Sequence, residues 1–154
     1  SYGTEALGVM RIEKGHVTGN ELSGTISARN LGMVKMVSSK KDSIGAVLAG
    51  REALVAEDGL CLVGLQAIDG DNVTAGSHLF AEGTPVDPAH DEGYVTSAAW
   101  SPHIGASIGL GFIARGADRH GEMVRLMNPL EGRSARARIC SPHFIDPEGE
   151  RLRG

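Results

Sequence analysis

The sequence predicts a mostly β fold, an antiparallel β-barrel of six or seven strands preceded by a short helix. The 154 residues suit one domain, and the 22 glycines, scattered through the chain, indicate many tight turns. From residue 60 onward, short apolar segments alternate with turns rich in Gly, Asp and Pro. Within one domain, we expect residues 1–58 to hold a leading helix, loop strands and a second helix, and residues 59–154 to form the barrel.

The front of the chain is predicted to begin with a helix over residues 3–14. Apolar residues recur there at spacings of three and four, Thr4 can cap the first turn, and Gly15 ends the helix. Residues 16–36 contain short apolar stretches that are broken by glycines. We expect this segment to be a loop with one or two strands.

A second helix is predicted over about residues 43–56, with Asp42 as its N-cap. Gly45 and Gly50 weaken it by up to about 1 kcal/mol each relative to alanine. We expect this helix to bury one apolar face, made of Ile44, Val47, Leu48 and Leu54.

Six short segments after residue 59 have the composition of strands, with turn residues between them. They lie at residues 60–65, around 78–80, and at 94–100, 106–114, 122–127 and 136–139. Residues 82–92, rich in Pro, Gly and Asp, are predicted to form a long loop, and residues 146–150 a turn with a polar ending. Closing the strands into a barrel removes the sheet edges that promote aggregation.

Composition excludes several classes of partner. The net charge of -4 gives no basic excess of the kind that nucleic acid binding requires, and no apolar run reaches the roughly 18 residues of a membrane-spanning helix. Cys61 and Cys140 lie far apart and match no CxxC pattern. We interpret them as buried thiols in a reducing cytoplasm, and we expect no nucleic acid and no membrane as partner.

No residue pattern in the chain predicts a catalytic group or a metal site. The segment Gly109–Ala114 fits the GxGxxA dinucleotide pattern, but it lies within an alternating strand, where glycines permit close packing. The six histidines show no HExxH spacing, and no serine stands in a GxSxG motif. We therefore expect the chain alone to be inactive and to support a site that is formed elsewhere.

Arg11 is the one candidate for ligand binding. Its neighbours three and four residues away on the predicted helix include no acidic side chain. Its guanidinium is therefore solvated, paired in the tertiary structure, or used for a ligand, and its planar fork suits a carboxylate or a polar ring edge.

Four segments, in this order, resemble the C-terminal barrel domain of the glycine-cleavage aminomethyltransferase (T-protein) family. Each segment is weak evidence alone, and their order and spacing make the set specific. They are residues 5–16 with 20–22 (A-x-x-x-L-R-x-E-x-G, then a polar residue, Glu and Leu), 40–45 (K-x-D-F-I-G, with Ser43 in place of the aromatic residue), 62–65 (L-V-G-L), and 93–102 with 108–113 (G-x-V-T-S-x-x-x-S-P and the strand after it). In addition, residues 97–102 and 144–154 are similar to the end of sarcosine oxidase alpha subunits.

The resemblance implies a tetrahydrofolate site that lies mainly in a larger preceding domain, together with the catalytic aspartate. Arg11 matches the arginine that helps hold the folate in this family. Glu13 matches the family glutamate, but two helix positions turn it about 200° from Arg11, so we interpret it as structural. We expect an exposed apolar patch along the leading helix and the adjoining barrel wall, where the preceding domain would pack.

The function implied is that of the C-terminal fragment of a sarcosine oxidase alpha subunit, which helps capture on tetrahydrofolate the one-carbon unit released by oxidative demethylation of sarcosine. The implied partners are the preceding aminomethyltransferase domain and the other sarcosine oxidase subunits. NAD and flavins would lie in other domains or subunits. Two alternatives stay open: a non-catalytic barrel module for subunit docking, and a fragment of a plain glycine-cleavage aminomethyltransferase.

Overall fold

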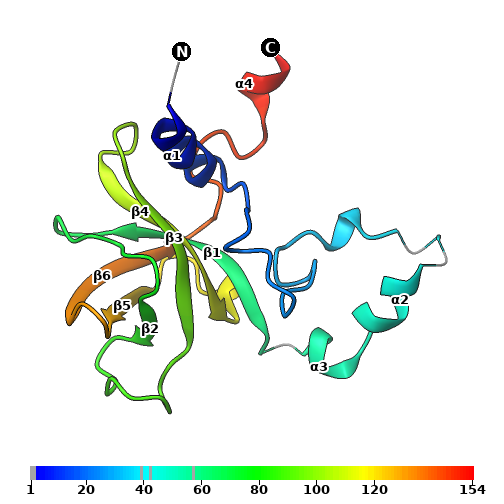
Figure 1. Ribbon diagram of the computed structural model, residues 1–154, viewed down its shortest axis with the longest axis horizontal. Helices are drawn as coiled ribbons and strands as arrows, with labels where there is room; N and C mark the ends of the chain where they lie inside the picture. Colours follow the sequence, from blue (N-terminus) through cyan, green and yellow to red (C-terminus); the bar gives the residue numbers. More distant parts are fainter. Residues whose placement is uncertain (1–2, 39, 42, 57) are drawn as a thin grey trace.

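Six antiparallel strands close into a barrel in the computed structural model, which describes residues 3–38, 40–41, 43–56 and 58–154. Around the barrel the strands follow the order β1-β4-β3-β2-β5-β6 (Figure 1). Their bounds are β1 Leu60–Ala67, β2 His78–Ala81, β3 Gly93–Ser101, β4 Ala106–Ala114, β5 Met123–Asn128 and β6 Arg133–Cys140. The predicted fold, a mostly β antiparallel barrel preceded by a short helix, is confirmed.

The barrel core consists of side chains that point inward from alternate strand positions, together with Val73 from the segment between β1 and β2. Burial of one Val, Leu or Ile side chain stabilises the fold by roughly 1.5–3 kcal/mol, so this cluster is the main source of stability. Its buried members are Val63, Leu65, Ala67, Val73, Leu79, Val95, Ile113, Val124, Leu126, Ala137 and Ile139.

A second apolar cluster joins α1 (Thr4–Lys14) to the outer wall of the barrel. Ile12 of the helix packs with residues of β1 and β4, and β4 is buried on both faces as a result. The strand residues of this cluster are Leu62, Ile108, Leu110 and Phe112. The cluster therefore fixes α1 across the strands that form the candidate site.

The two ends of α1 differ in how well the sequence predicted them. Gly3 occupies the N-cap position without a side-chain hydrogen bond, so the prediction that Thr4 caps the helix is wrong, because Thr4 is already its first helical residue. Gly15 ends the helix as predicted. Its φ is 74°, and a Cβ atom there would lie 2.5 Å from the carbonyl oxygen of Pro142, so this position requires glycine.

Residues 16–36 contain no strand, and the prediction of one or two strands here is wrong. Their backbone groups pair locally instead, as in the bonds from Glu21 N–H to Thr18 C=O and from Ile26 N–H to Ser23 C=O. Local turns of this kind use the donors that a sheet ladder would need. A short 3-10 helix, η1 (Val34–Met36), follows.

The predicted helix over 43–56 is two short helices, α2 (Ile44–Ala49) and α3 (Glu52–Val55), separated where Arg51 adopts an extended backbone. Asp42, the predicted N-cap, lies outside the described residues. The predicted buried face is wrong, since it is exposed: Ile44 is 93% and Val47 78% exposed, and Leu48 and Leu54 are also exposed. We call the described residues of 34–55 the arm, because they extend away from the barrel (Figure 1).

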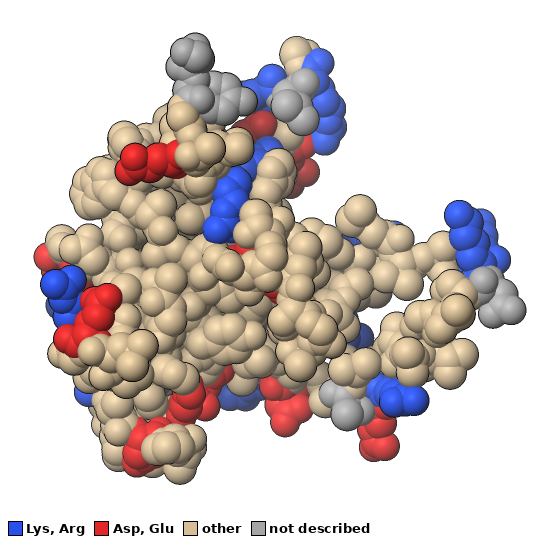
Figure 2. All heavy atoms as spheres, viewed as in Figure 1, with Lys and Arg blue, Asp and Glu red and all other residues tan. Residues whose placement is uncertain are grey.

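The arm is poorly covered by the rest of the described chain. In Figure 2 it projects beside the barrel as a largely uncharged protrusion, with charged side chains at its tip and lower edge. No helix among the described residues has both the length and the apolar composition needed to cross a membrane.

The tail of the chain packs against α1. The N–H groups of Phe144 and Ile145 both donate to the carbonyl of Glu13 at 3.0 Å. The expected turn at residues 146–150 leads into a short helix, α4 (Glu150–Arg153), which was not predicted from the sequence. The carboxylate of Asp146 accepts the N–H of Glu150 at 2.8 Å and so stabilises its start.

Candidate functional site

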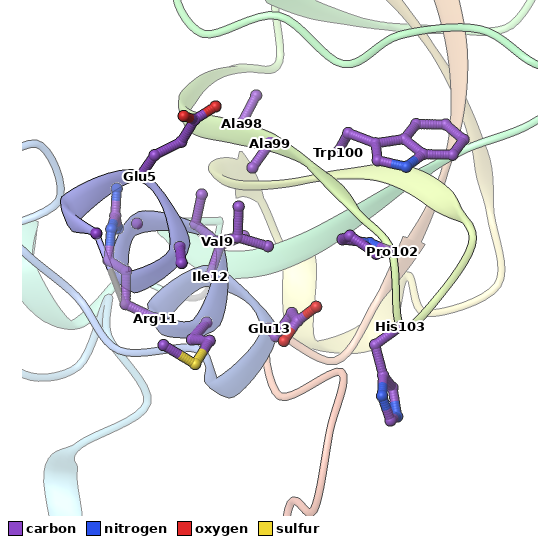
Figure 3. A pocket seen from close by; sticks show the side chains of 14 residues that line it. Glu5, Val9, Arg11, Ile12, Glu13, Ala98, Ala99, Trp100, Pro102 and His103 are labelled. Carbon is purple, nitrogen blue, oxygen red and sulfur yellow. The ribbon is translucent and has the colours of Figure 1, made fainter. Parts of the chain in front are cut away.

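A cleft of about 950 Å³ lies between α1 and the β3–β4 hairpin. Figure 3 shows α1 residues, Val9 and Ile12 among them, facing the strand that carries Ala98 and Ala99, with Trp100 beyond them. The predicted apolar patch is present along this cleft, because its lining residues Met10 and Trp100 are 43% and 56% exposed. Leu7 of α1, outside the cleft lining, is also exposed. Arg11 also lines the cleft.

Arg11 is held by three hydrogen bonds. Its Nη1 donates to Oε2 of Glu21 at 3.1 Å and, more weakly, to the carbonyl of His16 at 3.4 Å. Its Nη2 donates to Oγ of Ser97 at 2.6 Å. The side chain of Arg11 keeps 18% of its surface exposed, whereas that of Glu21 keeps none. Arg11 is therefore a tertiary ion-pair residue at the edge of the solvent.

Glu21 is a buried carboxylate that accepts hydrogen bonds from two other segments. The Oε2 atom accepts the backbone N–H of Thr18 at 2.8 Å and its hydroxyl at 3.2 Å. The Oε1 atom accepts the hydroxyls of Thr96 at 2.7 Å and Ser97 at 2.6 Å. Burial by itself raises the pKa of Glu21, but these bonds and the positive charge of Arg11 outweigh it and hold the pKa below its ordinary value.

A β-bulge in β3 brings the two hydroxyls to Glu21. Val95 pairs with Gly111 and Ser97 pairs with Leu110, so Thr96 is an extra residue opposite neither. Successive side chains of a regular strand point to opposite faces, but a bulge changes this direction locally. Thr96 and Ser97 can therefore both reach Glu21 although they are adjacent in sequence.

Three states of Arg11 are compatible with the sequence, and the structure shows tertiary pairing. Its partner Glu21 was missed because it lies ten residues away and beyond the end of α1. The available signal was the acidic residue after the R-x-E stretch together with the adjacent hydroxyl residues Thr96 and Ser97. The use of Arg11 for folate stays a prediction.

The pairing does not consume the whole guanidinium. An arginine has five N–H donors, and the three bonds above use two donors of Nη1 and one of Nη2. The N–H of Nε and the second N–H of Nη2 therefore have no partner among the described residues. Arg11 thus retains a two-donor edge for a carboxylate or a polar ring.

Glu13 has different contacts. It is buried, and its Oε1 accepts the hydroxyl of Ser101 at 2.5 Å, while its backbone carbonyl binds the tail. Figure 3 shows the side chain of Glu13 on the side of α1 that faces His103, away from the side chain of Arg11. These contacts join α1 to the end of β3 and support the structural interpretation.

The other sequence candidates lie outside this cleft. The segment Gly109–Ala114 lies within β4, and a Cβ atom on Gly111 would lie 2.7 Å from the carbonyl oxygen of Tyr94, which accounts for this glycine by close packing. In the part of the chain that the structure describes, no three His, Cys, Asp or Glu side chains gather as a metal would need. Cys61 and Cys140 are free as predicted, but both are only partly buried, so the prediction of buried thiols is wrong. Burial still raises the pKa of Cys140 to about 11, which makes it a weak nucleophile.

The barrel and the segments before it are similar in sequence to parts of known proteins. Residues 61–146 match the family described as the glycine cleavage T-protein C-terminal barrel domain. The chain is 48% identical over 153 residues to the sarcosine oxidase subunit alpha of Rhizobium meliloti (strain 1021), an alignment that covers 98% of this chain and 16% of that protein. It is 35% identical over 162 residues to the sarcosine oxidase subunit alpha of Corynebacterium sp. (strain U-96), covering 99% of this chain and again 16% of the relative.

Among solved structures, the crystal structure of the glycine cleavage system aminomethyltransferase T from Bartonella henselae superimposes with a TM-score of 0.67. The match covers 92% of this chain and 38% of that chain at 21% identity, and it shows likeness of fold. The chain thus spans about a sixth of the length of the two curated relatives.

Proposed function

Because the chain belongs to the glycine cleavage T-protein C-terminal barrel family, we propose that it forms the C-terminal part of a sarcosine oxidase alpha subunit. The 48% identity to such a subunit, which extends over nearly the whole chain, supports this assignment. In the complete protein, the barrel would help form a tetrahydrofolate site. That site would capture the one-carbon unit released by oxidative demethylation of sarcosine.

The observation that carries the folate proposal is the two-donor edge of Arg11 beside the cleft. Tetrahydrofolate offers carboxylates and a polar ring edge, and when bound it supplies the acceptor for the one-carbon unit. A planar guanidinium binds either group with two parallel hydrogen bonds. Among the described residues, Arg11 is the side chain that we assign to hold the cofactor.

The remaining machinery would lie outside this chain. We assign the catalytic group to the preceding aminomethyltransferase domain, and NAD and flavin sites to other domains or subunits. The cleft between α1 and the β3–β4 hairpin, with its exposed Met10 and Trp100, is the surface that the preceding domain would cover. The complete protein would act in the cytoplasm, with Cys61 and Cys140 reduced.

Arg11→Lys in the full-length protein tests the folate proposal. Lysine keeps a positive charge beside the buried carboxylate of Glu21 but lacks the planar fork. A charge-assisted hydrogen bond contributes about 1.5–3 kcal/mol, so we expect tetrahydrofolate affinity to fall by about 10- to 150-fold. Isothermal calorimetry and the melting temperature are measured on the same protein. If the affinity for tetrahydrofolate is unchanged and the melting temperature is lower, Arg11 serves only in the ion pair with Glu21 and the folate proposal is wrong.

A second candidate, a docking module without a working folate site, is favoured by the exposed apolar side chains of the arm. In that case the full-length wild-type protein would not bind tetrahydrofolate, and removal of the arm would prevent subunit assembly. Calorimetry with tetrahydrofolate therefore separates the two candidates directly. Assays of sarcosine oxidation by the full-length protein assembled with its partner subunits distinguish a sarcosine oxidase subunit from a plain glycine-cleavage aminomethyltransferase.

A further inference from the structure

The carboxylate of Glu21 is fixed independently of Arg11. Thr18 of the loop after α1 donates to Oε2 through its N–H and its hydroxyl, and two hydroxyls of β3 donate to Oε1. These four donors fill about the four lone-pair positions that a carboxylate offers. Glu21 therefore does not need Arg11 to satisfy its hydrogen bonds.

Arg11, in contrast, depends on this cluster for its orientation. A long arginine side chain has many rotamers, and holding a functional group within about 0.5 Å requires neighbours that fix its rotamer. Two of its three hydrogen bonds go to Glu21 and Ser97. Both of these partners are buried, with 0% and 3% of their surface exposed.

Ser97 closes the network. Its hydroxyl accepts a hydrogen bond from Nη2 of Arg11 and donates one to Oε1 of Glu21, each at 2.6 Å. Nη1 of Arg11 reaches the other carboxylate oxygen of Glu21 directly. The two contacts together fix the plane of the guanidinium, and they leave the N–H of Nε and the second N–H of Nη2 unused.

We propose that Glu21, supported by the Thr96–Ser97 bulge of β3, is a positioning residue that orients Arg11 for its ligand. This inference rests on the proposed function, in which that ligand is tetrahydrofolate. Glu21 itself does not touch the ligand and acts through Arg11. The buried carboxylate thus serves ligand recognition as well as the attachment of α1.

Glu13 provides a matched control. Like Glu21, it is a buried glutamate whose carboxylate accepts a serine hydroxyl from β3. Its side-chain bond goes to Ser101, and among the described residues no side-chain hydrogen bond links it to Arg11. Glu13→Gln should therefore weaken the contact between α1 and β3 without changing the hydrogen bonds that hold the Arg11 side chain.

The test measures tetrahydrofolate affinity by calorimetry in the full-length protein with Glu21→Gln, Glu13→Gln, Arg11→Lys and the Arg11→Lys/Glu21→Gln double variant. We expect E21Q to lower affinity by about tenfold, which corresponds to about 1.4 kcal/mol. We expect E13Q to keep wild-type affinity even if both glutamine variants melt at similar temperatures. Because Glu21 acts through Arg11, the double variant should bind no more weakly than R11K alone.

The outcomes separate this inference from the proposed function. If R11K binds tetrahydrofolate as tightly as the wild type, the folate role of Arg11 is wrong and the inference is wrong with it. If R11K binds weakly but E21Q binds normally, or if E21Q and R11K effects simply add, the positioning role is wrong while the proposed function stands.

If the E21Q variant does not fold, Ser97→Ala is used in its place to test the positioning role. This variant removes the hydroxyl that joins Arg11 to Glu21 but keeps the charge pair. We expect a loss in affinity of about threefold to tenfold, because the guanidinium loses one of the contacts that fix its plane. Wild-type affinity in S97A would overturn the positioning role.

Discussion

The barrel and the arm treat their apolar residues in opposite ways. In the barrel, Leu65 and Phe112 have no exposed surface. In the arm, Ile44 is 93% and Val47 78% exposed, although both were predicted to be buried. The barrel is therefore completed by residues of this chain, whereas the apolar side chains of the arm find no sufficient cover among the described residues.

This contrast indicates which contacts a sequence pattern can identify. An apolar periodicity shows that a face is suited to burial, but it does not show which chain or domain covers it. Exposed apolar groups of this kind mark interaction surfaces. In the proposed alpha subunit, other parts of the protein would cover the arm.

The largest expected effect is a truncation within the wall that is buried on both faces. Phe112→Ala should lower the free energy of unfolding by about 3–5 kcal/mol, because it leaves a cavity beneath α1 as well as removing buried apolar surface. Chemical denaturation of this chain measures the change. A loss below about 1 kcal/mol would mean that the second apolar cluster is much looser than the structure shows.

Two glycine substitutions, one in the barrel and one in the arm, should have smaller effects on the free energy of unfolding. A Cβ atom on Gly93 would overlap the backbone carbonyl of Phe112, so Gly93→Ala should destabilise by about 1–3 kcal/mol. Gly45 of α2 has no atom within 4 Å of such a Cβ, so Gly45→Ala should be neutral or stabilise by up to about 1 kcal/mol. Chemical denaturation measures the free energy of unfolding of both variants. Equal changes would contradict the conclusion that the barrel is closely packed and the arm is not.

The junction of α1 with the barrel should make stability depend on pH. The folded-state pKa of Glu21 lies below its ordinary value of 4.5, so ionised Glu21 contributes stability at neutral pH, and this contribution is lost as the pH falls through the folded-state pKa. Melting temperatures measured from neutral to acidic pH should fall more steeply for the wild type than for Glu21→Gln. Parallel curves would show that Glu21 is not the group responsible.

The smallest expected effect on stability lies in the arm. Ile44→Ser combined with Val47→Ser should change the free energy of unfolding of this chain by no more than about 0.5 kcal/mol per site, the usual range for exposed positions. Exposed apolar surface promotes association, so we expect the isolated chain to self-associate and this variant to do so less, as measured by analytical ultracentrifugation. A loss of several kcal/mol would mean that the arm packs on the barrel in solution.

The sequence predicted the barrel well because its strands follow from local patterns. All six strand segments were predicted within a few residues, since alternating burial and turn residues act over short distances. Residues 16–36 were predicted less well, because their short apolar stretches resemble strands while their hydrogen bonds are local. The break between α2 and α3 lies at Gly50–Arg51, where the glycine already weakened the prediction.

The candidate site was predicted only in part, since its geometry depends on contacts between distant residues. Arg11 was identified, but its partner Glu21 and the hydroxyl of Ser97 come from a turn and from a strand 86 positions away. Neither partner follows from helical spacing. The bulge at Thr96 could not be predicted either, because one extra residue in a strand has no signature without the register of the neighbouring strand.

The β-bulge at Thr96 also suggests how the Glu21 cluster could have evolved. Before Thr96, the even-numbered Tyr94 of β3 lies on the face toward α1. After Thr96, the odd-numbered Ala99 and Ser101 lie on that face. The alternation of side chains between the two faces therefore shifts by one residue at the bulge, and pairing with β4 resumes at Ser97. A single inserted codon is sufficient for this change. One inserted residue can therefore bring a second hydroxyl to the buried carboxylate of Glu21, while the strand pairs between β3 and β4 on either side of the bulge are kept.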